Sequence, residues 1–351
     1  MRGQEAIEKT EEHMYLGFVL SSIGNNMANI NSMKKKSKGI IRKIFNRINS
    51  LNLRKYYFQS AIVLMNAMLR SSILYACETY YNLKEGEIRQ IERIEEGFLR
   101  ELLKTSPGCP IKQIYLEFGQ IPARFEIIRI RLLYLKYILN QNKESMIHKF
   151  FTIQLESSGK GDWTTMCLDN LRELDVQNSL EEIKQMSPYQ FKKMLKEKVR
   201  QAALQYLTDK RGSKGAEINY QELQMADYLQ PIADLSIDVK RKIFEVRNKM
   251  TRIPANFSSR KTIFKCVCGE QEDMSHVYSC TVLNSDKPVT QYEEIYSNNI
   301  EKIKEVYQRF ENNINEREQI MNKNENEDKN EKVNKRKSPH AILISDPLYT
   351  G

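Results

Sequence analysis

The stretch from Phe264 to Cys280 reads FKCVCGEQEDMSHVYSC and holds three of the chain's six cysteines and one of its four histidines. One, seven and three residues separate the four side chains, which are Cys266, Cys268, His276 and Cys280. Three thiolates and an imidazole form the ligand set of a closed tetrahedral zinc site, which has no open position for a substrate. The spacing therefore predicts a structural Zn²⁺ knuckle over residues 258–285.

Two features of the stretch bear on this metal assignment. Gly269 follows the first cysteine pair, where the chain must turn tightly under the metal, and a residue without Cβ is least hindered there. The single residue between Cys266 and Cys268 is a shorter gap than the two residues of most zinc ribbons and fingers. The alternative is a set of unrelated reduced cysteines.

The composition indicates a protein of the cell interior. At 351 residues the chain is long enough for two or three compact units. It lacks a run of about 18 apolar residues, and its charged start does not resemble a signal peptide, so we expect no membrane partner. Isolated Cys77, Cys109 and Cys167 favour a reducing, intracellular location, in the nucleus and cytoplasm. No motif for a small-molecule substrate is present.

The positive charge is concentrated in one region. The net charge is +10, and residues 18–77 contain no Asp or Glu but ten Lys and Arg residues. Phosphate-rich partners, RNA and DNA, are the natural interpretation, although charge alone does not separate them from an anionic membrane or from an ordinary solvated helix face. The predicted nucleic-acid contacts here are Lys34, Lys35, Lys36, Lys38, Arg42, Lys43, Arg47, Arg54 and Lys55.

Apolar periodicity predicts a mainly α fold after a short N-terminal β-hairpin at residues 14–22. Three amphipathic helices, Lys35–Leu51, Tyr57–Tyr75 and Glu85–Lys104, are expected to pack as a small bundle. Pro110 and Pro122 then each mark the start of a helix, and Gly119 marks the end of the shorter one. On the helix after Pro122, Arg124 and Arg131 lie two turns apart, where they either follow a phosphate backbone or solvate the helix.

The second half continues as helices separated by glycine-rich breaks. We expect helices at Trp163–Leu174, Ser187–Leu207, Tyr220–Tyr228 and Ile237–Met250, the second of them opened by a Ser187/Gln190 capping box. After the cysteines a charged helix should run to about Met321. Residues 322–351 are Asn/Lys/Glu-rich and too poor in apolar residues to offset the entropy of ordering, so disorder is predicted.

The order of four motifs carries a resemblance to a known family. Tyr15-Leu16-Gly17 precedes the basic helix, and residues 71–80 (SSILYACETY), residues 115–122 (YLEFGQIP) and the cysteine stretch follow it. Each motif is common by itself, but the series, over residues 14–283, resembles the end of the palm, the thumb and the C-terminal zinc knuckle of reverse transcriptases from non-LTR (LINE-type) retrotransposons.

The resemblance implies a role for each part of the chain. Tyr15, Leu16 and Gly17 would belong to a primer-grip-like hairpin, the basic helices would hold template and primer, and the knuckle would help grip RNA or target DNA. The implied parts are an end of the palm (1–30), a helical thumb bundle (31–106), post-thumb helices (107–156), a helical linker domain (157–257), the CCHC knuckle (258–285), a charged helix (286–321) and the tail (322–351).

The chain departs from this family at the catalytic centre. Polymerisation by two metal ions needs carboxylates, and the family's paired Asp-Asp should lie before Tyr15, yet the chain contains no Asp-Asp. Asp162, Asp169 and Asp175 read as ordinary helix residues. We therefore expect a nucleic-acid-binding C-terminal fragment without catalysis of its own, and Mg²⁺ only if a palm lies upstream. The alternatives are a truncated gene model of an active reverse transcriptase, and a domesticated nucleic-acid-binding or scaffold protein.

Overall fold

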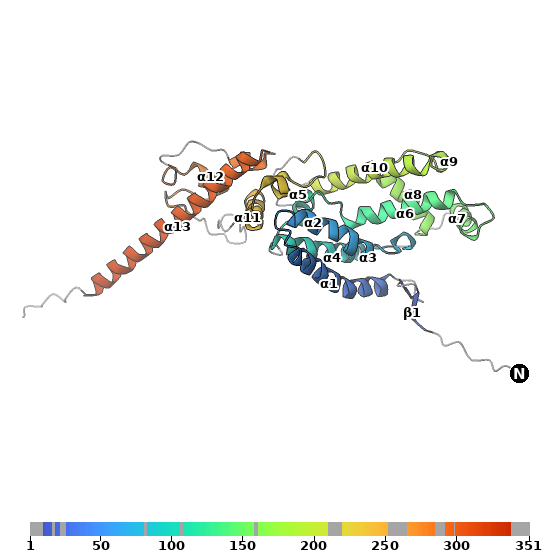
Figure 1. Cartoon of the computed structure of the whole chain (residues 1–351), viewed down its shortest axis with the longest axis horizontal. Coiled ribbons are helices and arrows are strands. Elements are labelled where there is room, and N and C mark those ends of the chain that lie inside the picture. The colour runs from blue at the N-terminus through green and yellow to red at the C-terminus, as the bar shows by residue number, and fades with distance from the viewer. Residues whose placement is uncertain are drawn as a thin grey trace, which may run out of the picture. The chain divides into compact units, whose positions relative to one another are not determined.

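The chain folds into two compact units, Met1–Asn248 and Lys249–Gly351 (Figure 1). The mainly helical fold and the N-terminal hairpin are confirmed. No helix in the described ranges is long and apolar enough to cross a membrane. The computed structural model describes residues 10–15, 18–21, 26–80, 83–105, 108–157, 161–209, 220–251, 265–271, 273–284, 292–297 and 299–337.

The hairpin pairs β1 (Glu12–Tyr15) with β2 (Phe18–Ser21) in antiparallel register. Every residue of β1 is exposed, including Tyr15 of the predicted primer grip. The other two residues of that prediction, Leu16 and Gly17, lie outside the described residues.

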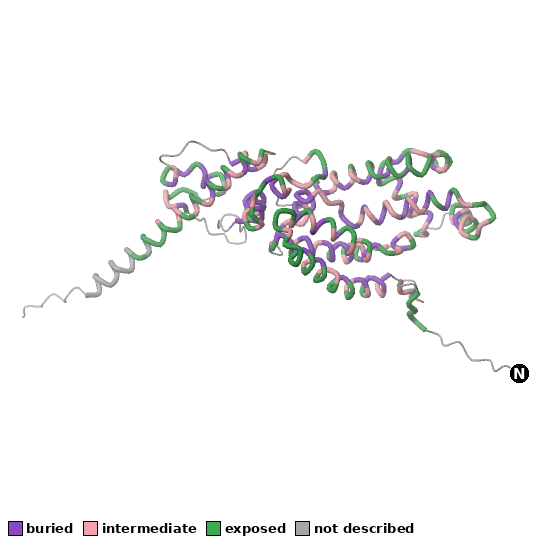
Figure 2. The backbone as a smooth tube through the Cα atoms, viewed as in Figure 1, coloured by how far each residue is buried: buried purple, intermediate pink, exposed green. Residues whose placement is uncertain are grey.

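The predicted thumb-like bundle consists of α1 (Met27–Ser50), α2 (Tyr57–Leu64) and α4 (Glu85–Leu103), with α1 in contact with both of the others. α1 begins at Met27 instead of Lys35, because apolar side chains continue its buried stripe toward the N-terminus. That stripe comprises Ile30, Met33, Ile44 and Ile48. Figure 2 shows the result, with buried residues along one face of α1 and exposed residues along the other.

The predicted helix Tyr57–Tyr75 is interrupted in its middle. Residues Met65–Arg70 (η1) are π-helical and lead into the short α3 (Ser71–Ile73). A π-helical turn widens the helix, and such turns occur mostly as local insertions. Arg70, at its end, lies against α4, where its Nε donates to Glu95 Oε1 at 2.7 Å.

Both proline predictions are confirmed: α5 (Ile111–Glu117) begins directly after Pro110, and α6 (Ala123–Leu139) directly after Pro122. Gly119 closes α5 with φ 61°. A Cβ at Gly119 would lie 2.3 Å from the backbone carbon of Gln224. Only glycine therefore permits this crossing of two backbone segments.

The segment that crosses Gly119 corrects one prediction. Residues 220–228 do not form the expected helix. The only helical turn in residues 220–229 is a 3₁₀ turn, Asp227–Leu229 (η3). The extended backbone is held by tertiary bonds instead, since Met225 bridges Phe118 and the Ala226 N–H donates to the Glu117 carbonyl at 2.8 Å. Contacts with α5 thus outweigh the local helical pattern.

A buried ion pair joins α5 to α11 (Ile237–Arg247). Arg247 Nε lies 2.9 Å from Glu117 Oε1, and the two side chains are 4% and 0% exposed. Tyr220 Oη donates to the same carboxylate oxygen at 2.9 Å. The YLEFGQIP stretch therefore anchors the chain around residue 220 and the end of α11.

Four further helices complete the first unit: α7 (Met146–Ser157), α8 (Trp163–Glu173), α9 (Leu180–Gln185) and α10 (Pro188–Thr208). The capping box that opens α10 is confirmed. Contacts run from α1 to α4, from α4 to α6 and from α6 to α10, so these four helices follow one another across the unit.

In the second unit, α12 (Met274–Ser279) and a 3₁₀ segment, Tyr292–Tyr296 (η6), pack against the long α13 (Ile300–Lys337). α13 continues through residues 322–337, where the composition predicts disorder. Extension of an already docked helix avoids the unfavourable nucleation step. Residues 338–351 lie outside the described residues.

Candidate metal centre and basic surface

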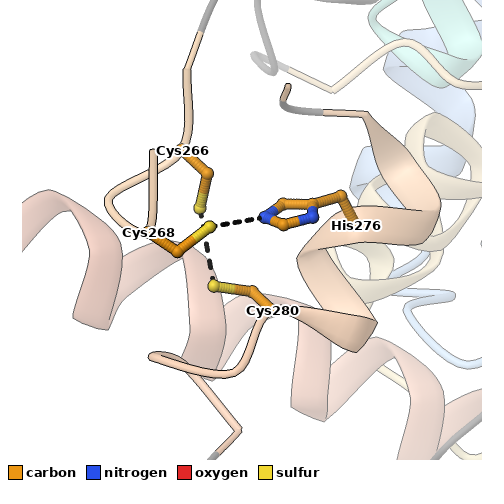
Figure 3. A group of neighbouring side chains, drawn as sticks. All are labelled: Cys266, Cys268, His276 and Cys280. Carbon is orange, nitrogen blue, oxygen red and sulfur yellow. Dashed lines mark hydrogen bonds between the residues drawn. The ribbon is translucent and has the colours of Figure 1, made fainter. Parts of the chain in front are cut away.

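The four predicted ligands converge on one point (Figure 3). Their ligand atoms all lie within 4.8 Å of one another, with Cys266 Sγ 3.6 Å from Cys280 Sγ and Cys268 Sγ 3.2 Å from His276 Nε2. A tetrahedron with Zn–S bonds of about 2.3 Å has edges of about 3.8 Å. The cluster could therefore bind a metal ion such as zinc, and within the described ranges it is the only group of this kind.

A tight turn presents the first two thiols. The Gly269 N–H donates to the Cys266 carbonyl and the Cys266 N–H to the Glu270 carbonyl, both at 2.8 Å. Gly269 has φ 90°, as the sequence predicted for a turn that needs glycine. These two bonds fold the chain back on itself and leave both sulfurs on the side that faces α12.

The other two ligands are His276, within α12, and Cys280, directly after its last residue. Asp273 caps its N-terminus, because Asp273 Oδ1 accepts from the His276 N–H at 2.7 Å. Cys280 follows His276 by four residues, and its N–H donates to the His276 carbonyl at 2.7 Å. Positions four apart lie on the same helix face, so the imidazole and the thiol point the same way.

Sequence reasoning missed the partner of the histidine. His276 Nδ1 lies 3.3 Å from Glu270 Oε2. A carboxylate on one ring nitrogen fixes the tautomer and leaves the other nitrogen free to ligate a metal, which is the usual outer-shell arrangement at zinc. The signal that could have shown this was a carboxylate in the turn directly after the first cysteine pair.

The centre is largely shielded from solvent, since Cys266, His276 and Cys280 are all buried. Burial raises the pKa of the Cys266 thiol to about 12. A bound cation acts in the opposite direction, because a coordinating thiol is deprotonated outright. Metal binding at this cluster would therefore release the thiol protons.

α13 docks directly on this centre. Tyr278 Oη donates to the Val306 carbonyl at 3.2 Å, and the fully buried Asn313 donates through Nδ2 to the Val277 carbonyl at 2.9 Å. Ile320 packs against the cluster formed by Cys266, Cys280 and Leu283. The sequence predicted a helix here but not its attachment to the knuckle.

The predicted nucleic-acid residues of α1 lie on its exposed side. Lys35, Lys38, Arg42, Lys43 and Arg47 are exposed, and none forms an ion pair with any residue that the structure describes. Lys36 is exposed as well, while Lys34 is half-buried and donates to Gln90 Oε1. Arg54 and Lys55, between α1 and α2, are exposed.

These cations form two rows along α1. At about 100° per residue, Lys35, Lys38 and Arg42 fall on one side of the exposed arc. Lys36, Lys43 and Arg47 fall on the other side. A strip of small polar residues separates the rows, namely Gly39, Asn46 and Ser50.

The two predicted contacts on α6 need correction. Arg131 is buried, and its guanidinium donates to Asn170 Oδ1 at 2.7 Å and to the Tyr80 carbonyl at 3.2 Å, so it is not available to a phosphate. Burial also lowers its pKa. Arg124 is 16% exposed and is paired with Glu92 at 2.6 Å and Glu85 at 2.8 Å. Sequence spacing placed both on the helix but could not show these partners.

The net positive charge of the chain lies in the first of its two units. Residues 249–351 contain sixteen basic and sixteen acidic residues, so residues 1–248 carry the whole net charge of +10. The described surface of the knuckle includes exposed Glu270 and Asp273 beside a single exposed lysine, Lys265. Positive potential therefore belongs to the first unit and not to the metal centre.

Comparison of the chain with protein-family models, with curated proteins and with solved structures finds no match. Its relation to reverse transcriptases is therefore a proposal.

Proposed function

We propose that the chain is a nucleic-acid-binding protein that corresponds to the thumb, linker and zinc knuckle of a LINE-type reverse transcriptase. The ordered motifs between residues 14 and 283 support the family, and the exposed face of α1 supports the binding. The chain's described part then acts by holding nucleic acid rather than by chemistry.

The observation that carries the proposal is the pair of cation rows on α1. A duplex presents two phosphate strands on either side of each groove, and a helix that lies along a groove meets one strand on each flank. Lys35, Lys38 and Arg42 would face one strand, and the other row would face its complement. Gly39, between the rows, has no side chain to hold the helix away from the groove.

The metal centre takes a structural role in this proposal. Its closed ligand set has no open position, and the net charge of its unit is zero. A structural Zn²⁺ would fix α12 and, through Asn313 and Tyr278, the first half of α13. We therefore assign the principal grip on nucleic acid to α1, and stability of the second unit to the knuckle.

The test is the salt dependence of duplex binding by the full chain. Fluorescence anisotropy would measure affinity for an RNA–DNA hybrid and a DNA duplex between about 50 and 200 mM salt. Changing Lys35, Lys38 and Arg42 to Ala should lower the slope of log K against log[salt] by about 2.7, because each lost phosphate contact contributes about 0.9.

A matched control removes three exposed lysines elsewhere, Lys143, Lys149 and Lys302. This variant should bind with nearly the same slope as the unmodified chain. The proposal fails if the α1 variant keeps the original slope, or if the control loses as much as the α1 variant does.

A further inference from the structure

A second cationic face lies on α10, and we call it the α10 face. It consists of Tyr189, Lys192, Lys193 and Lys196, all exposed. Tyr189 is 74% exposed, the highest value for any aromatic residue that the structure describes. At about 100° per residue these four side chains fall within one sector about 100° wide.

The three lysines of the α10 face have no acidic partner. None of them forms an ion pair or hydrogen bond with another residue in the described part of the chain, whereas nearby Lys198 pairs with Asp175 at 3.3 Å and Arg200 donates to the Leu223 carbonyl at 2.6 Å. Glu197, on the flank, forms no ion pair either. Lys198 and Arg200 therefore make polar contacts with other parts of the first unit, whereas Lys192, Lys193 and Lys196 make none with any residue that the structure describes.

The α10 face is held rigidly. Phe191, Leu195 and Val199, on the other side of the helix, are fully buried, and α10 packs on α5 and α6. The exposed ring of Tyr189 beside three lysines without an acidic partner suits a ligand with both a flat apolar surface and negative charge.

The α10 face is separate from α1. Contacts lead from α1 to α4, then to α6 and only then to α10. Figure 1 shows α1 and α10 at opposite edges of this unit. A duplex that lies along α1 would therefore leave Tyr189 uncovered.

We infer that the α10 face binds single-stranded nucleic acid, with an unpaired base stacked on Tyr189 and the following phosphates on Lys192, Lys193 and Lys196. Stacking on an exposed aromatic ring beside a cationic track is how proteins hold single strands without reading their sequence. The inference goes beyond the proposed duplex contact and does not depend on it.

The shape of the α10 face favours one strand over two. Its three lysines lie within one continuous sector about 100° wide, whereas the cations of α1 fall into two rows with an uncharged strip between them. Tyr189 and Lys196 are seven residues apart, about 10.5 Å along the helix. This length matches about three stacked nucleotides at about 3.4 Å each.

The experiment uses the full chain and a short single-stranded RNA that carries 2-aminopurine, whose fluorescence falls when the base stacks on an aromatic ring. Three variants are compared: Tyr189→Phe, Tyr189→Ala, and Lys192, Lys193 and Lys196 changed together to Ala. All four residues are exposed, so circular dichroism should show unchanged helix content.

Tyr189→Phe should bind and quench like the unmodified chain, because the ring is kept. Tyr189→Ala should weaken binding roughly 5- to 150-fold and abolish quenching, since one stacked base contributes that much to affinity. The lysine variant should lose affinity and reduce the salt slope by about 2, at about 0.7 per contact for a single strand.

Two results would overturn the inference. In the first, the Tyr189→Ala variant binds the RNA and quenches its fluorescence as the unmodified chain does. In the second, polyglutamate displaces the RNA equally well from the Tyr189→Ala variant and from the unmodified chain. The latter would identify a charge-only site for an acidic protein. Loss of duplex binding in the α1 variant with single-strand binding intact would separate this site from the proposed function.

Discussion

Removing one ligand of the metal centre should unfold the second unit locally while the first unit stays folded. In Cys280→Ala the site keeps only three ligands, and the residue lost is 1% exposed and packed against Leu283. Structural zinc contributes about 10–16 kcal/mol of binding free energy in small metal domains. Because a whole domain has a free energy of unfolding of only about 5–15 kcal/mol, loss of a contribution of that size should unfold the segment around the metal.

The structure specifies where protection should be lost. His276 lies in α12 and Cys280 directly follows it, and α13 is attached to α12 through Asn313 and Tyr278. Hydrogen exchange of the Cys280→Ala variant should therefore quicken in α12 and in the first half of α13. The amides of α4, in the other unit, should exchange as before.

Zinc content by elemental mass spectrometry completes the assay. The matched control is Cys167→Ala, which removes a thiol that is equally buried but belongs to the first unit. It should retain one equivalent of zinc. The reasoning is refuted if Cys280→Ala also retains one equivalent with α12 still protected, or if α4 loses protection together with α12.

Three further predictions concern single groups. Glu270→Gln removes the carboxylate beside His276 Nδ1 and should weaken zinc affinity about 10- to 100-fold in a chelator competition, with helix content unchanged. Glu117→Gln leaves the Arg247 charge buried without its partner, so urea unfolding should show a free energy of unfolding about 3–5 kcal/mol lower. The control is Glu126→Gln, which breaks the more exposed pair with Arg129 and should lower the free energy of unfolding by less than about 1 kcal/mol. Burial raises the pKa of Cys77, Cys109 and Cys167 to about 12, so these thiols stay protonated near neutral pH and iodoacetamide should label them only after unfolding; labelling of any of them in the folded chain would contradict their burial.

The sequence correctly predicted those features that depend on residues close together in the chain. Pro110, Pro122 and the Ser187 capping box each act within one turn of helix, and each was recognised from residue type and spacing. The metal ligands belong to the same class, because a turn and one short helix bring all four together. Such features need no knowledge of what packs against them.

Two of the errors arise where distant segments meet. Residues 220–228 have a helical pattern, but Gly119 and Glu117 hold them extended. Arg131 has the spacing of a surface arginine, yet Asn170 and the Tyr80 carbonyl bind it inside the unit. The partners of these interactions lie far apart in the sequence, so local sequence patterns could not predict the contacts.

Whether a cation is paired inside the fold or exposed on its surface decides if it can bind a ligand. Arg70, Arg124 and Arg247 are paired with carboxylates and Arg131 with neutral acceptors, and all four lie between helices of the first unit, so their charge is used by the fold. Other cations form no ion pair with any residue that the structure describes, and they gather on two exposed faces: Lys35, Lys38, Arg42, Lys43 and Arg47 on α1, and Lys192, Lys193 and Lys196 beside Tyr189 on α10. Solubility alone would be served by scattered charges of both signs. This segregated pattern is the basis of the proposed duplex contact on α1 and of the inferred single-strand contact beside Tyr189 on α10.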